Sequence, residues 1–251
     1  MSYLNKTNLL KAMVTNKLSD PKLLLDDVDR EAVFRVLKRS KAGIPRSIGV
    51  TDEPVEEARF AKMPVRDKNR LGELREQLQK NTQKCIVELL AFQRKYPDVP
   101  IIYNYIAIAY HYNNQQDKYA EVLFETVSKF PEYLFGKLSL CEYCLNQNKH
   151  EEIPKILDRK LEIWMHRPKE NIFHISEVRT FLNVVGRYFT RENKLARALY
   201  HYFALAGFDP DHPTAIRLGQ EIIMKEIENT MDPSNNNVQR KSGKNRTKNQ
   251  P

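Results

Sequence analysis

Apolar residues recur every three to four positions from Leu71 onward, and this spacing limits the fold more than any other feature of the chain. Such a stripe is typical of a helix that buries one face. Three successive stripes contain Cys85, Ile86, Leu89, Leu90 and Phe92, then Tyr103, Ile106, Ala107 and Tyr110, then Ala120, Leu123, Phe124 and Val127. Short polar breaks at 96–98, 113–116 and 130–132 separate the stripes, so we expect antiparallel neighbouring helices.

The helices also repeat with a fixed period. Pro97 and Pro131 each end a helix and stand 34 positions apart. We therefore divide the chain into frames of 34 residues, each containing characteristic large and small positions and a proline near its end. In the frame at 100–133 these positions hold Tyr103, Ile106, Ala107, Tyr110, Leu123 and Pro131. A second frame at 179–212 fills the same places with Leu182, Val185, Gly186, Phe189, Ala198, Tyr202 and Pro210. This pattern resembles the tetratricopeptide repeat (TPR) family, whose unit is a 34-residue pair of antiparallel helices.

The resemblance covers about 66–231 and implies an all-α fold. The helix pairs would form a short right-handed, TPR-like α-solenoid, with a capping helix at 213–231. Several places depart from the pattern: Tyr119 occupies a small place, the frame at 134–167 lacks its closing proline, and about eleven residues from Pro168 interrupt the period. A non-repeating helical bundle is the alternative fold.

The net charge of +9 over 251 residues is concentrated at the two ends of the chain. Residues 1–70 carry +5, residues 71–234 carry −1 and residues 235–251 carry +5. Composition and prolines predict four parts: an N-terminal amphipathic helical segment (1–41), a proline-containing linker (42–65), the repeat domain (66–231) and a disordered basic tail (232–251).

The resemblance also implies a function. In the TPR family the first helix of each pair lines a concave groove that binds a peptide or helix of a partner protein. The matching places here hold Asn104, Ile108, His111, Tyr112, Glu142, Asn146, Asn183, Arg187 and Arg191. Asn side chains can bond a peptide backbone, and Arg can meet an acid. The alternative is that these side chains are solvated or pack on a neighbouring helix. We therefore expect a non-enzymatic scaffold, adaptor or chaperone.

One TPR subgroup clamps the carboxylate at a chaperone's C-terminus, and this chain departs from its pattern. Asn104 matches one clamp position, but Ile108 replaces the second Asn. Leu138 and Ser139 stand where that subgroup has its paired cations. The sequence therefore argues against a chaperone-tail clamp.

No motif for catalysis, a cofactor or a metal stands out. Cys141 and Cys144 form a C-x-x-C, but it falls within a helix, and no second cysteine pair accompanies it. We read these two cysteines as packing thiols, with a zinc or helical enzyme role as the alternative. The sequence holds no nucleotide-binding glycine loop and no nucleophile elbow. We expect no enzyme activity, no cofactor and no metal.

The basic tail supports a second hypothesis, a helical-repeat protein that binds nucleic acid. Its cations are Arg240, Lys241, Lys244, Arg246 and Lys248. Cations that neutralise phosphates give salt-dependent binding, but the tail lacks the interleaved aromatics that stack on bases. A solubilising tail is the simpler interpretation. Three cysteines, no secretory signal and no bilayer-length apolar stretch predict a protein of the reducing cytoplasm.

Overall fold

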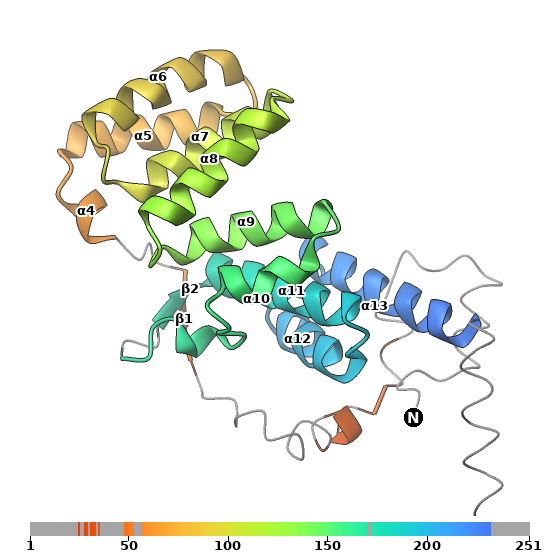
Figure 1. Cartoon of the computed structure of the whole chain (residues 1–251). Coiled ribbons are helices and arrows are strands. Elements are labelled where there is room, and N and C mark those ends of the chain that lie inside the picture. The colour runs from red at the N-terminus through yellow and green to blue at the C-terminus, as the bar shows by residue number, and fades with distance from the viewer. Residues whose placement is uncertain are drawn as a thin grey trace, which may run out of the picture. The chain divides into compact units, whose positions relative to one another are not determined.

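The chain is mostly helical, and its helices pack on one another (Figure 1). The computed structural model describes residues 25, 28–29, 31–33, 35, 48–52, 57–169 and 172–231. None of the helices in these ranges combines the length and the apolar composition that a membrane crossing requires. The all-α expectation is therefore met at the level of secondary structure, apart from one short two-stranded sheet.

The helices follow one another along most of the described chain. Their bounds are α4 (Ala58–Ala61), α5 (Val65–Gln77), α6 (Thr82–Lys95), α7 (Pro100–Tyr112), α8 (Gln116–Lys129), α9 (Leu134–Asn146), α10 (Ile153–Ile156), α11 (Ile175–Arg191), α12 (Leu195–Phe208) and α13 (Pro213–Met231). Two 3-10 turns are η1 (His150–Glu152) and η2 (Ile163–Met165), and the strands are β1 (Gly49–Thr51) and β2 (Ile172–His174).

The chain divides into two compact units, Pro45–Val184 and a second unit that joins Met1–Ile44 to Val185–Pro251. In the first unit each helix from α5 to α9 packs on the next one, and successive helices reverse direction (Figure 1). A shared core runs through them, with residues such as Leu71, Leu89, Ile102, Ile106 and Leu123 almost fully buried. The amphipathic stripes of the sequence thus meet in one apolar layer.

The predicted polar breaks fall between helices. Helix α6 ends at Lys95 before Pro97, α7 ends at Tyr112, and α8 ends at Lys129 before Pro131. Proline cannot continue a helix, because it lacks a backbone N–H and disfavours helix in the preceding residue.

An asparagine in the left-handed region follows α7, α9 and α11. Asn114, Asn148 and Asn193 have φ of 55°, 57° and 56°. In each case the next residue donates its N–H to a carbonyl five positions back, over 3.0 Å in the first turn and 2.8 Å in the other two. This bond closes the end of the helix, and Asn tolerates the left-handed conformation better than most residues. The same chemistry therefore turns the chain back after each of these helices.

The frame at 134–167 differs from the others in its second half. Instead of a full second helix it contains η1 and the four-residue α10. The helix stops there because Asp158 and Arg159 adopt positive φ of 51° and 60°, and Arg159 N donates to Pro154 O at 2.6 Å. A regular helix cannot continue through two left-handed residues.

The interruption after Pro168 contains a strand and the start of α11. Strand β2 pairs in parallel with β1, which lies in the stretch predicted as a linker, with Val50 opposite Phe173. Glu177, in the first turn of α11, is 3% exposed and accepts two hydrogen bonds from Arg167, at 2.6 and 2.7 Å. A paired, bidentate carboxylate of this kind can be buried at little net cost.

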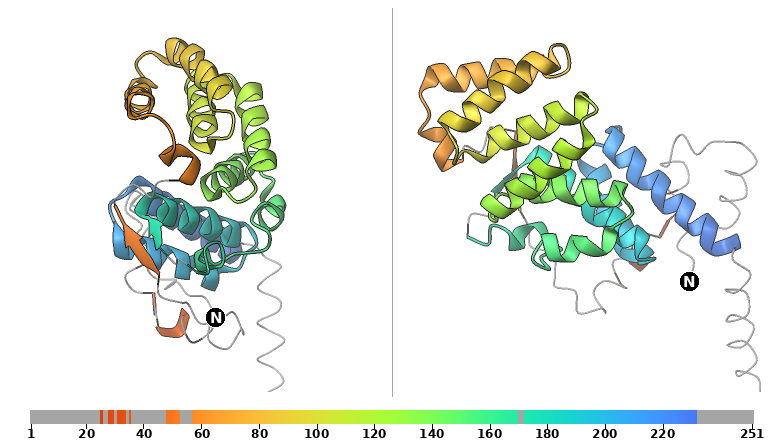
Figure 2. Two further views of the ribbon diagram at one scale, coloured as in Figure 1. Left: turned by 90° about the vertical axis from the view of Figure 1, so that its left-hand side faces the viewer. Right: turned by 45° about the horizontal axis from the view of Figure 1, so that its top comes forward.

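In the second unit α12 and α13 pack on each other (Figure 2). Gly186 permits a close approach to both helices. A Cβ atom built at Gly186 would lie 2.7 Å from Cδ2 of Leu218 and 3.2 Å from Cβ of His201. Leu218 and Ala198 are fully buried. The sequence places small residues at Gly186 and Ala198 for this reason, and no larger side chain fits at Gly186 without displacing the core.

We predict that Gly186→Ala and Gly72→Ala change stability in opposite directions. Gly72 lies in α5 with no atom within 4 Å of its added Cβ, so alanine there should stabilise the chain by about 0.5–1 kcal/mol through helix propensity. Gly186→Ala should destabilise it by about 1–3 kcal/mol, because the methyl group overpacks a filled core. Urea unfolding followed by circular dichroism measures both, and a shift of equal sign would contradict the packing at Gly186.

We also predict that acid lowers the stability of the folded protein through His201. Its side chain is buried, its ring stacks on Phe189 with centroids 5.6 Å apart, and its Nδ1 has no hydrogen-bond partner. Burial lowers the pKa of His201 to about 3. The unfolded chain takes up this proton near pH 6.5, so folded stability falls as the pH drops from about 6.5 towards 3.

The measurement compares the wild type with His201→Leu, which cannot titrate. The free energy of unfolding of the wild type should fall relative to that of the variant by about 1.4 kcal/mol per pH unit below pH 6. At pH 7.5 the variant should be no less stable, because it removes a buried group with an unsatisfied nitrogen. Parallel pH curves for the two proteins would show that His201 does not control this sensitivity.

Candidate partner-binding surface

Helix α7 leaves one stripe of its surface accessible. Pro100 starts the helix after an extended Val99, and the residues between its accessible positions are buried. The positions that are not buried are Ile101, Asn104, Ile108, His111 and Tyr112. Their spacing of three to four residues puts them on one face. The four groove residues expected on this helix, Asn104 to Tyr112, are thus among its accessible residues.

Helix α9 presents a similar stripe. Glu142 is half-buried and Asn146 is exposed, whereas Leu138 and Leu145 are buried. The Oε1 atom of Glu142 accepts a hydrogen bond from Nδ2 of Asn183 at 3.3 Å. Two of the expected groove residues therefore contact each other directly.

Helix α11 differs, because all of its residues from 181 to 190 are buried. Asn183 is 3% exposed and Arg187 is 2% exposed. Within the second unit, Nε of Arg187 donates to Oε1 of Glu221 in α13 at 2.8 Å. These two expected groove residues face neighbouring protein groups, which was the alternative interpretation of their sequence positions. Arg191 is exposed and lines a groove of about 260 Å³ with Thr190, Arg217, Gln220, Glu221 and Met224.

Five rings form a continuous series of contacts over α7, α8 and α9, which we call the aromatic surface. Its members are His111, Tyr112, Tyr119, Phe124 and Tyr143. Ring centroids lie 5.2 Å apart for His111 and Tyr119, 5.8 Å for Tyr119 and Tyr143, and 6.4 Å for Phe124 and Tyr143. These separations are typical of aromatic pairs that stabilise each other.

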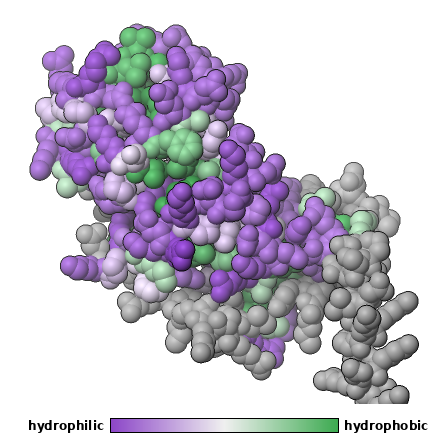
Figure 3. Space-filling view, viewed as in Figure 1, coloured by the Kyte–Doolittle hydropathy of each residue, from purple (hydrophilic) through white to green (hydrophobic). Residues whose placement is uncertain are grey.

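The aromatic surface is open to solvent at both ends. Tyr112 is 43% exposed and Phe124 is 56% exposed. Figure 3 shows apolar residues reaching the surface over α8, with hydrophilic residues around them. The hydroxyl of Tyr112 accepts a hydrogen bond from Nε2 of Gln79 at 3.0 Å, which orients that ring. Exposed apolar groups that form a contiguous patch mark interaction sites more often than single ones do.

Two of these rings were expected from the sequence and three were missed. His111 and Tyr112 were expected groove residues, whereas Tyr119, Phe124 and Tyr143 were not. Tyr119 stands where the repeat pattern requires a small residue, and this departure was the available signal. Phe124 lies in the stripe that predicted α8, so its exposure could not be seen from the spacing alone.

The hydroxyl of Tyr119, in the middle of the aromatic surface, remains protonated at neutral pH. Burial raises the pKa of Tyr119 to about 12, and the nearby charge of Glu142 acts in the same direction. A neutral phenol can donate one hydrogen bond and accept others. The surface therefore offers ring faces together with the neutral hydroxyl of Tyr119.

The two cysteines of the C-x-x-C lie inside the protein. Cys141 and Cys144 are buried, and burial raises the pKa of both thiols above their ordinary value. The thiolate is the reactive form and the metal ligand, so burial disfavours the reactive form of both side chains. Within the described ranges, no group of three or more His, Cys, Asp and Glu side chains is arranged to hold a metal ion.

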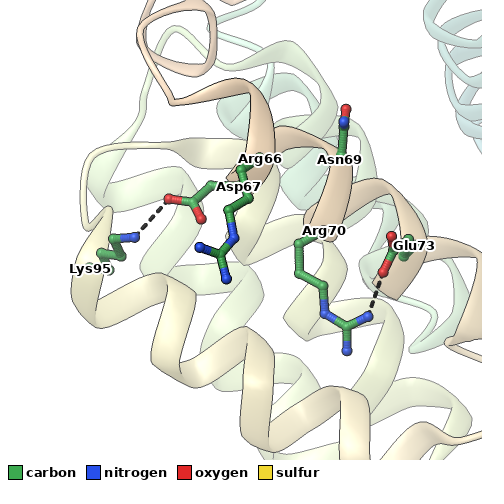
Figure 4. Close-up of a pocket in the computed structure, with 6 residues that line it drawn as sticks. All are labelled: Arg66, Asp67, Asn69, Arg70, Glu73 and Lys95. Carbon is green, nitrogen blue, oxygen red and sulfur yellow. Dashed lines mark hydrogen bonds and ion pairs between the residues drawn. The ribbon is translucent and has the colours of Figure 1, made fainter.

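A charged hollow lies between α5 and α6, and its ion pairs are already formed (Figure 4). Lys95 contacts Asp67 at 2.7 Å, and Arg70 contacts Glu73 at 2.5 Å and Glu88 at 2.7 Å. Arg66 extends between Asp67 and Arg70 (Figure 4). The carboxylates that line the hollow are thus already paired with cations of the same chain, as is typical of a solvated, charged surface.

The remaining expected residues belong to the basic tail. Arg240, Lys241, Lys244, Arg246 and Lys248 lie outside the residues that the structure describes. The nucleic-acid hypothesis that depends on them therefore stays a prediction.

No family model matches the chain, and neither do any of the curated proteins or solved structures with which it was compared.

Proposed function

We propose that this chain is a non-enzymatic, TPR-like helical-repeat protein that binds a segment of a partner protein on the aromatic surface and the adjacent stripes of α7 and α9. Such a protein would act as a scaffold, adaptor or chaperone, without a cofactor. The free, buried cysteines accord with the reducing cytoplasm as its location.

Recurrent local structure supports the repeat part of the proposal. Asn114 and Asn148 are 34 positions apart, and both follow the first helix of a frame in the left-handed conformation. Asn193 follows 45 positions later, which equals one period plus the eleven inserted residues. Helices α7 and α9 begin 34 positions apart, at Pro100 and Leu134. A period that returns in the helix starts and in their end caps is typical of a repeat protein.

The exposure of the aromatic surface is the single observation that carries the binding part. Burial of an aromatic side chain is strongly favourable, so such rings usually lie inside a folded protein. Here Phe124 and Tyr112 stay exposed beside half-buried Tyr119 and Tyr143, with the polar side chains of Glu142 and Asn146 next to them on α9. Aromatic anchors with a polar rim are the usual composition of a protein-binding hot spot.

We predict that loss of the exposed rings abolishes partner binding. The tagged full chain and its Tyr112→Ala/Phe124→Ala variant should be used to capture proteins from cells, with quantitative mass spectrometry of what each retains. Partners of the aromatic surface should fall at least tenfold with the variant, because a hot-spot aromatic contributes about 2 kcal/mol or more.

The matched control is Val87→Ala, which removes an apolar side chain that is 61% exposed on α6, away from the rings. It should retain the partners at the wild-type level. Circular dichroism of all three proteins checks that they fold alike. If the ring variant retains the same proteins in the same amounts as the wild type, the aromatic surface is not the binding site.

A further inference from the structure

Charge is distributed unevenly along residues 57–153 of the first unit. Residues 57–112 hold ten basic and six acidic residues, a net charge of +4. Residues 113–153, which include α8 and α9, hold seven acidic and four basic residues, a net charge of −3. Three of the five rings of the aromatic surface therefore lie in the acidic range 113–153.

Three of these acidic residues form a stripe along α8. Asp117, Glu121 and Glu125 are spaced four positions apart, so they project from one side of the helix, and all three are exposed. None of them has an ion pair within the part of the chain that the structure describes. Like charges at this spacing repel each other, so the stripe slightly weakens the helix that carries it.

The two lysines of α8 form no ion pair with this stripe among the described contacts, and each lies over an aromatic ring. Nζ of Lys118 lies 5.5 Å from the ring centroid of Tyr110. Nζ of Lys129 donates to the hydroxyl of Tyr103 at 2.8 Å and lies 5.8 Å from the ring centroid of Phe130. Other carboxylates of the same unit do form ion pairs: Glu88, Asp67 and Glu132 each pair with a cation.

Phe124 lies beside this acidic stripe. It is one turn from Glu121 and next to Glu125 in sequence, and its ring contacts Tyr143 on α9. An exposed apolar ring bordered by unpaired carboxylates is complementary to a segment with an apolar side and a cationic edge. Such a segment would cover the ring and place its Lys or Arg side chains against the carboxylates.

We infer that the aromatic surface selects an amphipathic partner segment with Lys or Arg along one edge, and that Asp117, Glu121 and Glu125 make this selection. The inference rests on the proposed function and adds to it the chemistry of the partner. An acidic segment would meet like charges at this edge, which disfavours it.

The test measures how the full chain binds two synthetic amphipathic helical peptides. Both peptides carry the same leucines and one tryptophan on the apolar side, but one has lysines and the other glutamates on the polar side. Fluorescence anisotropy gives both affinities. The lysine peptide should bind at least tenfold more tightly than the glutamate peptide, and raised salt should weaken its binding. Equal affinities for the two peptides, or no binding of the lysine peptide, would overturn the inference.

A charge-neutralising variant then locates the selecting residues. Asp117→Asn/Glu121→Gln/Glu125→Gln should weaken binding of the lysine peptide roughly tenfold, since each exposed pair contributes modestly. The matched control, Glu76→Gln/Asp98→Asn/Glu152→Gln, removes the same charge from exposed residues outside α8 and should leave the affinity unchanged. An equal effect of both variants would assign the preference to net charge and overturn the role of the stripe.

Failure of the inference can be told apart from failure of the proposed function with Phe124→Ala. If this variant weakens binding of both peptides equally and neither peptide is preferred, the aromatic surface binds without charge selection, so the proposed function stands and the inference fails.

A truncated chain that ends at Met231 tests whether the chain's own basic tail occupies the aromatic surface. If truncation markedly tightens binding of the lysine peptide, the tail competes for the surface, and the assignment to a separate partner is overturned.

Discussion

The turn at Asn114, Asn148 and Asn193 is the constraint on which the rest of the fold depends. A left-handed residue closes the helix and reverses the chain within a few residues, so the next helix packs against the one just completed. Because the reversal occurs at the same point of each frame, the apolar stripes meet and the polar positions of α7 and α9 stay accessible. A β-branched residue at these asparagines would strain the backbone at the point that sets this arrangement.

The sequence predicts the local structure well, because its signals are local. Pro97 and Pro131 mark helix ends through the chemistry of proline itself, and Gly186 marks a close approach that the structure places against Leu218 and His201. It predicts less of the candidate site, since exposure depends on residues far apart in the chain. Arg187 is buried beside Glu221 of α13, which pairs with it from 34 positions further along the chain. The exposed ring of Phe124 contacts Tyr143 of α9, which is 19 positions away in sequence.

Polar residues of α11 occupy the expected groove positions of the repeat pattern, yet they form contacts inside the protein instead of facing a ligand. Arg187 is paired with Glu221, and the neighbouring Thr190 donates to the carbonyl of Gly186, so both polar groups are satisfied inside the protein. A buried charge left without its partner would be strongly destabilising, which commits Arg187 to this pair. On α7, α8 and α9, by contrast, polar and aromatic groups of the same sequence pattern remain accessible.

The net charge of +9 does not describe what a partner meets at that surface. Charges separated by more than about 8 Å in physiological salt are largely screened, so the charged groups beside the rings act on a bound segment more strongly than distant charges do. Beside Phe124 those groups are Asp117, Glu121 and Glu125, while the lysines of α8 are held against rings. A protein with a net positive charge thus carries a local acidic edge beside an exposed aromatic residue, and the proposed selection of a cationic segment rests on that edge and not on the overall charge.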